Sequence, residues 1–282
     1  MAAPRVVLTG AAGGLGHDIL PALLDAGFDV IGLDVRPGGD PRIPWVRCDL
    51  ADTETLGRAL AGAAAVIHLA GIPLEADWGD ISRVNIDGTQ HVLHAAWLAA
   101  VPRAVLASSV HAAGFTRVPP PGRRIPDDTV IRPNTFYGVS KAALEALGRL
   151  YHDRYGMDVV CLRIASRFAA PQNERMLGSW LSPADAGRLF VAALTAPHPG
   201  FQTVWGVSAN TRSCYSAAGG ERLGYRPEDD AEAFAGDILR AAEHDPQIAA
   251  TAWDREFIGG VFCSEAPPRY VRLPGSGTGT GR

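Results

Sequence analysis

Short apolar runs alternate with longer amphipathic stretches through the first 165 residues of the chain. The runs are rich in Val, Ile and Leu, as strands of a covered parallel sheet are, and the stretches between them have helical length. The alternation predicts an α/β fold, a Rossmann-type doubly wound parallel sheet with helices on both faces. We predict strands at 5–9, 29–34, 44–48, 64–71, 103–109 and 157–165, and helices from the first glycine-rich turn to Leu24 and at 53–61, 80–100 and 136–155.

This rhythm changes after about residue 166. A helix is expected at 182–196, with Ser182 as its N-cap and Pro183 in its first turn. A strand is expected at 201–209 and a further helix at 228–243. We interpret the chain as a nucleotide-binding core (1–165), small C-terminal substrate-binding cap elements interleaved with that core (166–265), and a disordered tail rich in Gly, Ser and Thr (266–282).

Composition narrows the classes of function. The formal net charge of −4 and the absence of a basic stripe argue against nucleic acid as a partner. The sequence has no apolar run near the ~20 residues of a membrane span, and its N-terminus lacks the apolar region of a secretory signal. Four cysteines without CxxC spacing indicate reduced thiols of a cytoplasmic protein. His91 and His94 lie three apart without an evident carboxylate or thiol partner, so no metal site is expected.

Glycines fill the connection between the first strand and the first helix. In "VVLTGAAGGLGHDIL", Gly10 permits a tight turn, Gly13 lets backbone N–H groups approach a pyrophosphate, and Gly16 lets the helix pack on the strand. The N-terminus of the helix adds partial positive charge. The strand before, the helix after and an acidic residue farther on give this GxxGxxG pattern the context of a dinucleotide site.

That acidic residue is Asp34, at the end of the second strand. Its carboxylate can accept hydrogen bonds from both hydroxyls of the adenosine ribose, and it repels a 2′-phosphate. We therefore predict NAD rather than NADP as the cofactor. Arg36 is the competing signal, because a guanidinium can pair with a 2′-phosphate.

Further small and polar residues follow the next strands. Asp49, after the third strand, is placed to accept from the adenine amino group, and Ala70 and Gly71, after the fourth, are small enough to let a cofactor pass. Asn85 is a polar residue within an otherwise amphipathic helix, and on its own it reads as a surface residue.

Tyr137 and Lys141 lie four residues apart, on one face of the helix predicted at 136–155. A phenolate can take the hydroxyl proton of an alcohol if its pKa, normally about 10, is lowered toward the operating pH. A lysine ammonium on the same face favours the anion. Ser109, at the end of the fifth strand, is placed to hold the reacting oxygen.

Together these motifs resemble the extended short-chain dehydrogenase/reductase superfamily, the NAD-dependent epimerase/dehydratases, over roughly residues 5–165. The resemblance implies catalysis by Ser109, Tyr137 and Lys141, with Lys141 also holding the nicotinamide ribose. The cofactor contacts that we carry over are Gly10, Gly13, Gly14, Leu15, Gly16, Asp34, Asp49, Leu50, Leu69, Ala70, Gly71, Asn85, Tyr137 and Lys141.

The second half resembles uronate dehydrogenases, which oxidise C1 of glucuronate or galacturonate to an aldarolactone with NAD. The pattern P-x-N-x-R-M-L-S-x-W of that family is matched by Pro171, Asn173, Arg175, Met176, Leu177 and Trp180. The resemblance implies that Arg175 binds the sugar carboxylate and that His111 and Ser166 line the substrate site, with Ser109 and Tyr137.

Two positions depart from that family's pattern. Val110 stands where the family has an amide, and Pro73 stands where it has a hydroxyl, so two of the expected substrate contacts lose a hydrogen bond worth about 0.5–1.5 kcal/mol each. The ordinary alternative for Arg175 is a surface ion pair with Glu174 or Asp185, and for His111 a hydrogen-bonded wall residue.

Three functions remain open: an NAD-dependent sugar-acid dehydrogenase, a nucleotide-sugar epimerase or dehydratase, and a non-enzymatic cofactor sensor. The segment after the core is short for a nucleotide-sugar domain, and a sensor is expected to lose Tyr137 or Lys141. We favour the sugar-acid dehydrogenase, and a dehydrogenase of another sugar is a further alternative. We expect the protein to be cytoplasmic and to form a homo-oligomer, a dimer or larger.

Overall fold

The computed structural model describes residues 3–270. Within that range the main sheet has seven parallel strands in the order β3-β2-β1-β4-β5-β6-β9, and a separate parallel pair joins β7 to β8. The predicted doubly wound sheet is confirmed. The strands are β1 (Arg5–Thr9), β2 (Asp29–Asp34), β3 (Trp45–Arg47), β4 (Ala65–His68), β5 (Arg103–Ser109), β6 (Asp158–Ile164), β7 (Ser166–Arg167), β8 (Trp180–Leu181) and β9 (Phe201–Gly206).

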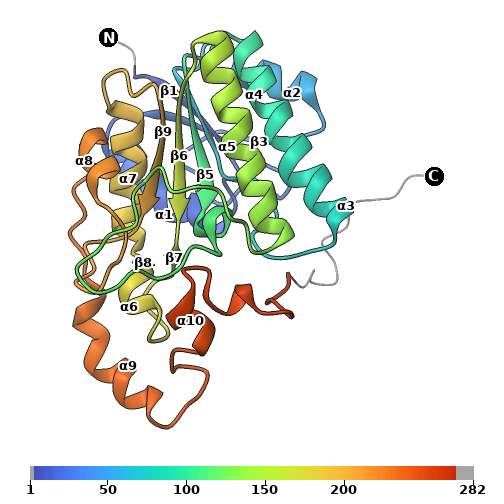
Figure 1. The fold of residues 1–282 in the computed structure, drawn as a ribbon. Coiled ribbons are helices and arrows are strands. Elements are labelled where there is room, and N and C mark those ends of the chain that lie inside the picture. The colour runs from blue at the N-terminus through green and yellow to red at the C-terminus, as the bar shows by residue number, and fades with distance from the viewer. Residues whose placement is uncertain (1–2, 271–282) are drawn as a thin grey trace.

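Helices cover both faces of the sheet (Figure 1). The α-helices are α1 (Gly14–Asp25), α2 (Thr53–Leu60), α3 (Trp78–Ile81), α4 (Gly88–Leu98), α5 (Phe136–Tyr155), α6 (Met176–Ser179), α7 (Pro183–Thr195), α8 (Ala218–Leu223), α9 (Ala235–Ala242) and α10 (Ala252–Glu256). A π-helical segment (Ser82–Asp87) joins α3 to α4, and 3₁₀ turns occupy Val110–Ala113, Ala231–Phe234 and Gly260–Cys263.

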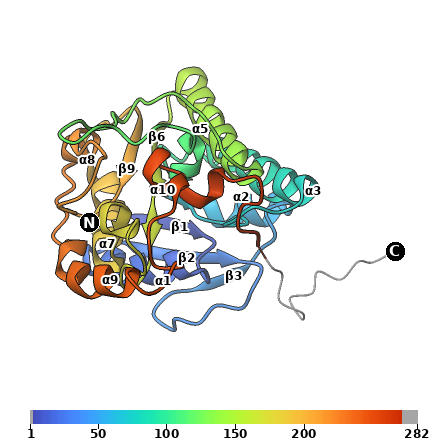
Figure 2. The ribbon, with the colours of Figure 1, turned by 60° about the horizontal axis from the view of Figure 1, so that its bottom comes forward.

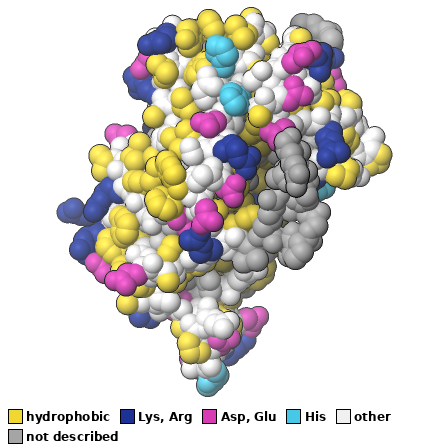
Figure 3. Space-filling model, turned by 90° about the vertical axis from the view of Figure 1, so that its right-hand side faces the viewer, with side chains coloured by type: hydrophobic (Ala, Val, Ile, Leu, Met, Phe, Trp, Pro, Cys, Tyr) yellow, Lys and Arg dark blue, Asp and Glu magenta, His cyan; other side chains and the backbone are white. Residues whose placement is uncertain are grey.

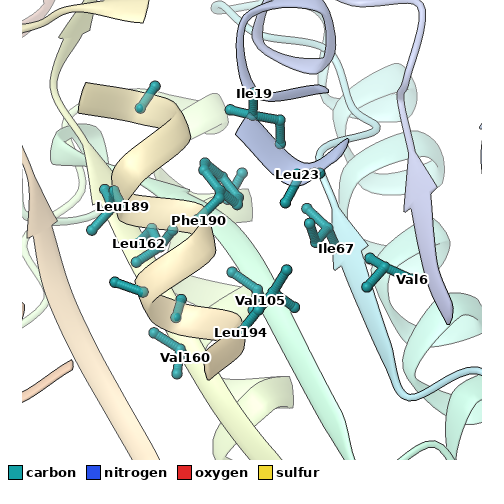
Figure 4. Packing of buried hydrophobic residues seen from close by; sticks show 14 of the residues in the cluster. Val6, Ile19, Leu23, Ile67, Val105, Val160, Leu162, Leu189, Phe190 and Leu194 are labelled. Atoms are coloured by element: carbon teal, nitrogen blue, oxygen red, sulfur yellow. The ribbon is translucent and has the colours of Figure 1, made fainter. Parts of the chain in front are cut away.

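Alternation along the strands produces two apolar cores, one on each side of the sheet. Val6 and Leu8 of β1 enter the core under α1 and α7, whereas Val7 enters the core under α2, α4 and α5. Figure 4 shows the first core, in which Val6, Ile67, Val105, Val160 and Leu162 of the strands meet Ile19 and Leu23 of α1 and Leu189, Phe190 and Leu194 of α7. Because both faces are covered, the strands read as continuous apolar runs.

The helix predicted at 80–100 is the main local difference. The structure divides it into α3, the π-helical segment and α4. An i→i+5 turn contains one more residue than an α-helical turn, and it rotates the residues after it about the helix axis. Asn85 lies within this π-helical segment, and only 3% of its surface is exposed. The amphipathic pattern alone did not reveal this inserted residue.

Smaller elements gather at the carboxyl ends of the strands. Figure 1 shows β7, β8, α6, α9 and α10 below the sheet, and Figure 2, which brings this end forward, shows α10 in front of β6. The helix predicted at 182–196 is confirmed as α7, with the Ser182 side chain accepting from Asp185 N and Pro183 in the first turn. The helix predicted at 228–243 begins as a 3₁₀ turn and continues as α9.

The last residues that the structure describes return to the N-terminal half. Arg269 forms a β-bridge with Glu75, and the Tyr270 N–H donates to the Glu75 carbonyl at 2.7 Å. Most of the tail predicted at 266–282 lies outside the described residues. No helix within the described part is long and apolar enough to cross a membrane. On the face drawn in Figure 3, acidic and basic side chains are interspersed among apolar ones.

Candidate active site

The turn between β1 and α1 is shaped by close backbone approaches. Gly10 has φ +72°, in the left-handed region that favours glycine, and a Cβ there would lie 2.5 Å from Ala70 N. A Cβ at Gly16 would lie 2.4 Å from the Ala11 carbonyl oxygen, so this glycine lets α1 start against the turn. The sheet order reverses between β1 and β4, and such switch points are where open α/β sheets bind ligands.

Asp34 lies at this edge, at the end of β2, with 8% of its surface exposed. One carboxylate oxygen accepts from Ala12 N at 3.0 Å, and the other accepts from Arg36 N at 3.0 Å. The Arg36 guanidinium lies 3.4 Å from the same carboxylate while remaining mostly exposed. Arg36 therefore forms an ion pair with Asp34 in this structure.

The other predicted cofactor contacts are distributed along the same edge. Asp49 is exposed and accepts from Ala51 N at 3.0 Å, and Leu50, Leu69 and Ala70 are half-buried. Gly13 and Leu15 are half-buried in the first turn and the start of α1, and Gly14 beside them is exposed.

Asn85 is a buried connector rather than a surface residue. Its Oδ1 accepts from Ile72 N at 2.7 Å, and its Nδ2 donates to the Ile72 carbonyl and to Ser140 Oγ, both at 3.0 Å. Ser140 in turn donates to the Tyr137 carbonyl at 2.7 Å. Asn85 thus joins the loop after β4, which contains Gly71, to the first turn of α5.

Ser109, Tyr137 and Lys141 come together where β5 ends and α5 begins. The Lys141 ammonium lies 5.6 Å from the centre of the Tyr137 ring and donates to the Ala107 carbonyl of β5 at 2.7 Å. Thr135 caps α5, with its hydroxyl accepting from Gly138 N at 2.8 Å. Burial raises the pKa of Tyr137 to about 12, and a hydrogen bond with Ser109 opposes this rise. Burial lowers the pKa of Lys141 to about 8, against the attraction of Cys161 and Glu145.

His111 lies beside this group, with its ring centre 5.9 Å from that of Tyr137. Its Nδ1 is 3.2 Å from Asn134 Oδ1, and Asn134 Nδ2 donates to Cys263 Sγ at 3.3 Å. Because Asn134 uses its amide N–H on the thiol, its oxygen accepts, and His111 carries a proton on Nδ1. Burial, followed by the nearby Arg175 charge, lowers the pKa of His111 to about 3. The ring is therefore neutral, and Nε2 is an acceptor.

Arg175 precedes α6 and has three protein partners. Its Nη2 donates to the Ile258 carbonyl at 2.7 Å, its Nη1 donates to Ser166 Oγ at 3.3 Å, and its Nε lies 3.6 Å from Asp254. Its ion-pair partner is therefore Asp254, not Glu174 or Asp185, the partners considered from sequence. Ser166 also bonds Ser179 at 2.9 Å.

The two departures from the uronate pattern lie in different surroundings. Val110 is 1% exposed and belongs to an apolar cluster with Trp205 and Tyr215, whereas Pro73 is exposed. These positions do not show whether Val110 or Pro73 contacts a sugar, so both remain predicted substrate contacts.

Sequence reasoning missed Glu75, whose side chain is buried beside the start of α5. Its Oε2 accepts from Tyr137 N at 3.0 Å. Nothing in "PLEADWGD" distinguishes Glu75 from the neighbouring acidic residues. Asn134 and Asp254 were also missed, because their partners lie far away in the sequence. Within residues 3–270 no group of three or more His, Cys, Asp or Glu side chains is placed to hold a metal ion.

Comparisons with known proteins agree with this architecture. The chain is 36% identical to uronate dehydrogenase of Pseudomonas putida over 93% of its own length and 97% of that protein's. It is 39% identical to an NAD-dependent glucose-6-phosphate dehydrogenase of Haloferax volcanii, over 81% of this chain and 95% of that one. The crystal structure of uronate dehydrogenase from Agrobacterium tumefaciens superposes with a TM-score of 0.84 at 35% identity, covering 93% of this chain and 97% of that one. Residues 6–203 match the NAD dependent epimerase/dehydratase family, and the chain belongs to that family.

Proposed function

We propose that this protein oxidises a hexuronate such as glucuronate or galacturonate at C1 to the aldarolactone, with Tyr137 as the general base. It is an NAD-dependent dehydrogenase acting on a CH–OH group, as its family and its uronate dehydrogenase relatives indicate. One observation carries the choice of substrate, namely that a cationic side chain lies near Tyr137. The ring centres of His111 and Tyr137 are 5.9 Å apart, and the charge of Arg175, which could bind a carboxylate, contributes to the lowered pKa of His111.

The edge formed by β1, β2 and β4 fits NAD. The Gly10 turn and the close packing at Gly16 leave the N-terminus of α1 open to a pyrophosphate. A solved relative, a mutant of the Agrobacterium tumefaciens enzyme, is described as complexed with NAD (35% identity, TM-score 0.83). NAD, when bound, accepts the hydride that leaves C1 of the sugar.

The residues at the end of β5 account for the proton. The hydrogen on C1 leaves with its bonding electrons as hydride. The bond from C1 to its hydroxyl oxygen becomes the lactone carbonyl, and the hydroxyl proton passes to the Tyr137 oxygen. A phenol with a pKa of about 12 is almost entirely protonated at neutral pH, so its anion has to be stabilised before it can act as the base. The Lys141 ammonium supplies positive charge for this, and Ser109 holds the reacting oxygen by a hydrogen bond.

Arg175 is the proposed partner of the carboxylate. A guanidinium has five N–H groups in a planar fork, and the three protein contacts of Arg175 leave N–H groups for a bidentate carboxylate. A neutral aldose has CH₂OH in place of the carboxylate and leaves these donors unpaired, which is how polar sites reject near-isosteres. The acceptor Nε2 of His111 is available to a sugar hydroxyl.

A phosphorylated aldose is the second candidate. The Haloferax volcanii relative is named for glucose 6-phosphate, and a phosphate also suits an arginine fork. The nucleotide-sugar epimerase or dehydratase alternative has no comparable support from the residues at the site.

The test compares NADH formation with glucuronate, galacturonate, glucose 6-phosphate and glucose. We expect kcat/KM for a hexuronate to exceed that for glucose by at least ~100-fold, from a charge-assisted contact of about 1.5–3 kcal/mol and the penalty of an unmet charge. Arg175→Met should remove most of this preference by raising KM for the acid, whereas Arg175→Lys, which keeps the charge, should retain part of it. Equal turnover of acid and neutral sugar, or a preference that survives Arg175→Met, would make Arg175 a structural residue.

Three further statements are part of this proposal. The division into a core at 1–165 and cap elements at 166–265, the cytoplasmic location and the homo-oligomeric state are expected from the sequence. Subcellular fractionation and light scattering of the purified enzyme test the last two.

A further inference from the structure

Arg167 lies against the glycine-rich turn. It is the second residue of β7, paired with Leu181 of β8, and a Cβ at Gly14 would lie 2.6 Å from both of its terminal nitrogens. The guanidinium therefore rests on the backbone of Gly14, the first residue of α1. Sequence analysis assigned Gly14 to the cofactor and gave Arg167 no role.

The one ion-pair partner of Arg167 among the described residues is Asp18, one turn into α1. Arg167 Nε lies 2.9 Å from Asp18 Oδ2, yet both atoms are buried without an aligned hydrogen bond. Burial raises the pKa of Asp18, with Arg167 opposing this rise. Among residues 3–270, the ion pair with Asp18 is the polar contact found for the Arg167 side chain, and it uses Nε rather than Nη1 or Nη2. A charged fork with unused donors is thus held beside the N-terminus of α1.

A diphosphate is the anion that fits this place. The pyrophosphate of a dinucleotide binds at the N-terminus of the first helix in folds of this type. Asp18 alone would repel it, and the Arg167 charge offsets that repulsion. Arginine pairs with phosphate through parallel N–H···O bonds.

We infer that Arg167 is a further cofactor-binding residue, whose terminal N–H groups donate to the NAD pyrophosphate while Asp18 holds the guanidinium over Gly14. This inference rests on NAD as the cofactor of the proposed function but not on the identity of the sugar. Its test therefore uses cofactor fragments and no sugar.

Calorimetric titration of the full-length protein with ADP-ribose and with adenosine separates the diphosphate from the nucleoside. We expect Arg167→Met to weaken ADP-ribose binding by roughly tenfold or more, as for the loss of a charge-assisted contact, and to leave adenosine binding unchanged. The wild-type affinity for ADP-ribose should fall more steeply with salt than that of the variant. Arg149→Met, which removes an exposed arginine paired with Asp153 on α5, is the control and should match wild type.

Two variants at Asp18 exclude a purely structural role. If Arg167→Met acted only by leaving the Asp18 carboxylate buried and unpaired, the double variant Asp18→Asn/Arg167→Met would regain ADP-ribose affinity. We expect the double variant to stay weak and Asp18→Asn alone to bind at least as tightly as wild type. Wild-type affinity in Arg167→Met, an equal loss for adenosine, or recovery in the double variant overturns the inference.

Discussion

The cofactor edge and the region around Arg175 where we propose that the sugar binds, the sugar-facing edge, are built in different ways. At the cofactor edge, Asp34 accepts from the backbone of Ala12 and Arg36, and the Gly10 turn is set by its own φ and by the approach of Ala70. At the sugar-facing edge, Arg175 donates to a carbonyl 83 residues away. The first edge depends on backbone N–H groups and on glycines that allow close backbone approach, whereas the second depends on side-chain contacts between distant segments. Loss of one side chain should therefore disturb the second more.

The largest expected effect is on the free energy of unfolding, and it concerns a buried ion pair between β6 and α5. Arg163 of β6 and Glu145 of α5 form a fully buried bidentate pair, and Glu145 also accepts from Ser108. Arg163→Met leaves the Glu145 carboxylate buried without its partner, and removing one member of such a pair costs about 3–5 kcal/mol. Urea unfolding measures this free energy.

The exposed pair of Arg149 and Asp153, on the same helix as Glu145, is the matched control. Arg149→Met should change the free energy of unfolding by no more than about 1 kcal/mol. A similarly small loss in Arg163→Met would contradict the expectation that this buried pair stabilises the packing of α5 on β6.

Next in size is the effect of removing the base. Tyr137→Phe keeps the ring and its contact with Lys141 but removes the ionisable oxygen, so kcat should fall by at least ~100-fold. ADP-ribose affinity should change much less than kcat, because most of the predicted cofactor contacts lie along the ends of β1, β2 and β4. Lys141→Ala should reduce both kcat and cofactor affinity. Near-normal turnover by the Phe variant would exclude Tyr137 as the base.

The pH dependence of kcat follows from the same two groups. Below the pKa of Tyr137, the active phenolate fraction falls about tenfold for each pH unit. With NAD and sugar saturating, kcat should therefore rise with pH and level off above about 8, where Lys141 loses its charge. A flat profile between about pH 6 and 8 would mean that the proton leaves by another route.

The smallest predicted effect concerns the cofactor edge itself. Asp34 should make the enzyme prefer NAD to NADP by at least about tenfold in kcat/KM, or roughly 1.4 kcal/mol. Because Arg36 is held by the Asp34 carboxylate, Arg36→Ala should keep this preference. Equal use of both cofactors by the wild-type enzyme would show that Arg36 outweighs the carboxylate.

The sequence allowed the sheet and the cofactor edge to be predicted because their signals are local. The predicted limits of β1, β2, β5 and α5 agree with the structure, since each combines a periodic apolar pattern with a cap or turn at its ends. The convergence of Ser109, Tyr137 and Lys141 was also expected, because β5 ends where α5 begins.

The remaining site residues have no local signal. From the sequence Asn85 is expected to be exposed, but it is buried within the π-helical segment and bonded to Ile72 and Ser140, which are 13 and 55 residues away. Asp254 belongs to the capping box of α10, and its proximity to Arg175, far earlier in the chain, arises only from tertiary packing. Pairings over such separations follow from tertiary packing, not from periodicity.

The bridge between Arg269 and Glu75 has a consequence for the order of events during synthesis. Glu75 accepts from the backbone of Tyr137, and Phe262 packs on His111 with ring centres 4.5 Å apart. When the first 165 residues have left the ribosome, the strands β1 to β6 are available, but Phe262 and Arg269 are still inside the exit tunnel or not yet made. The surroundings of His111 and Glu75, beside the start of α5, are therefore completed only after the chain has been translated through residue 269.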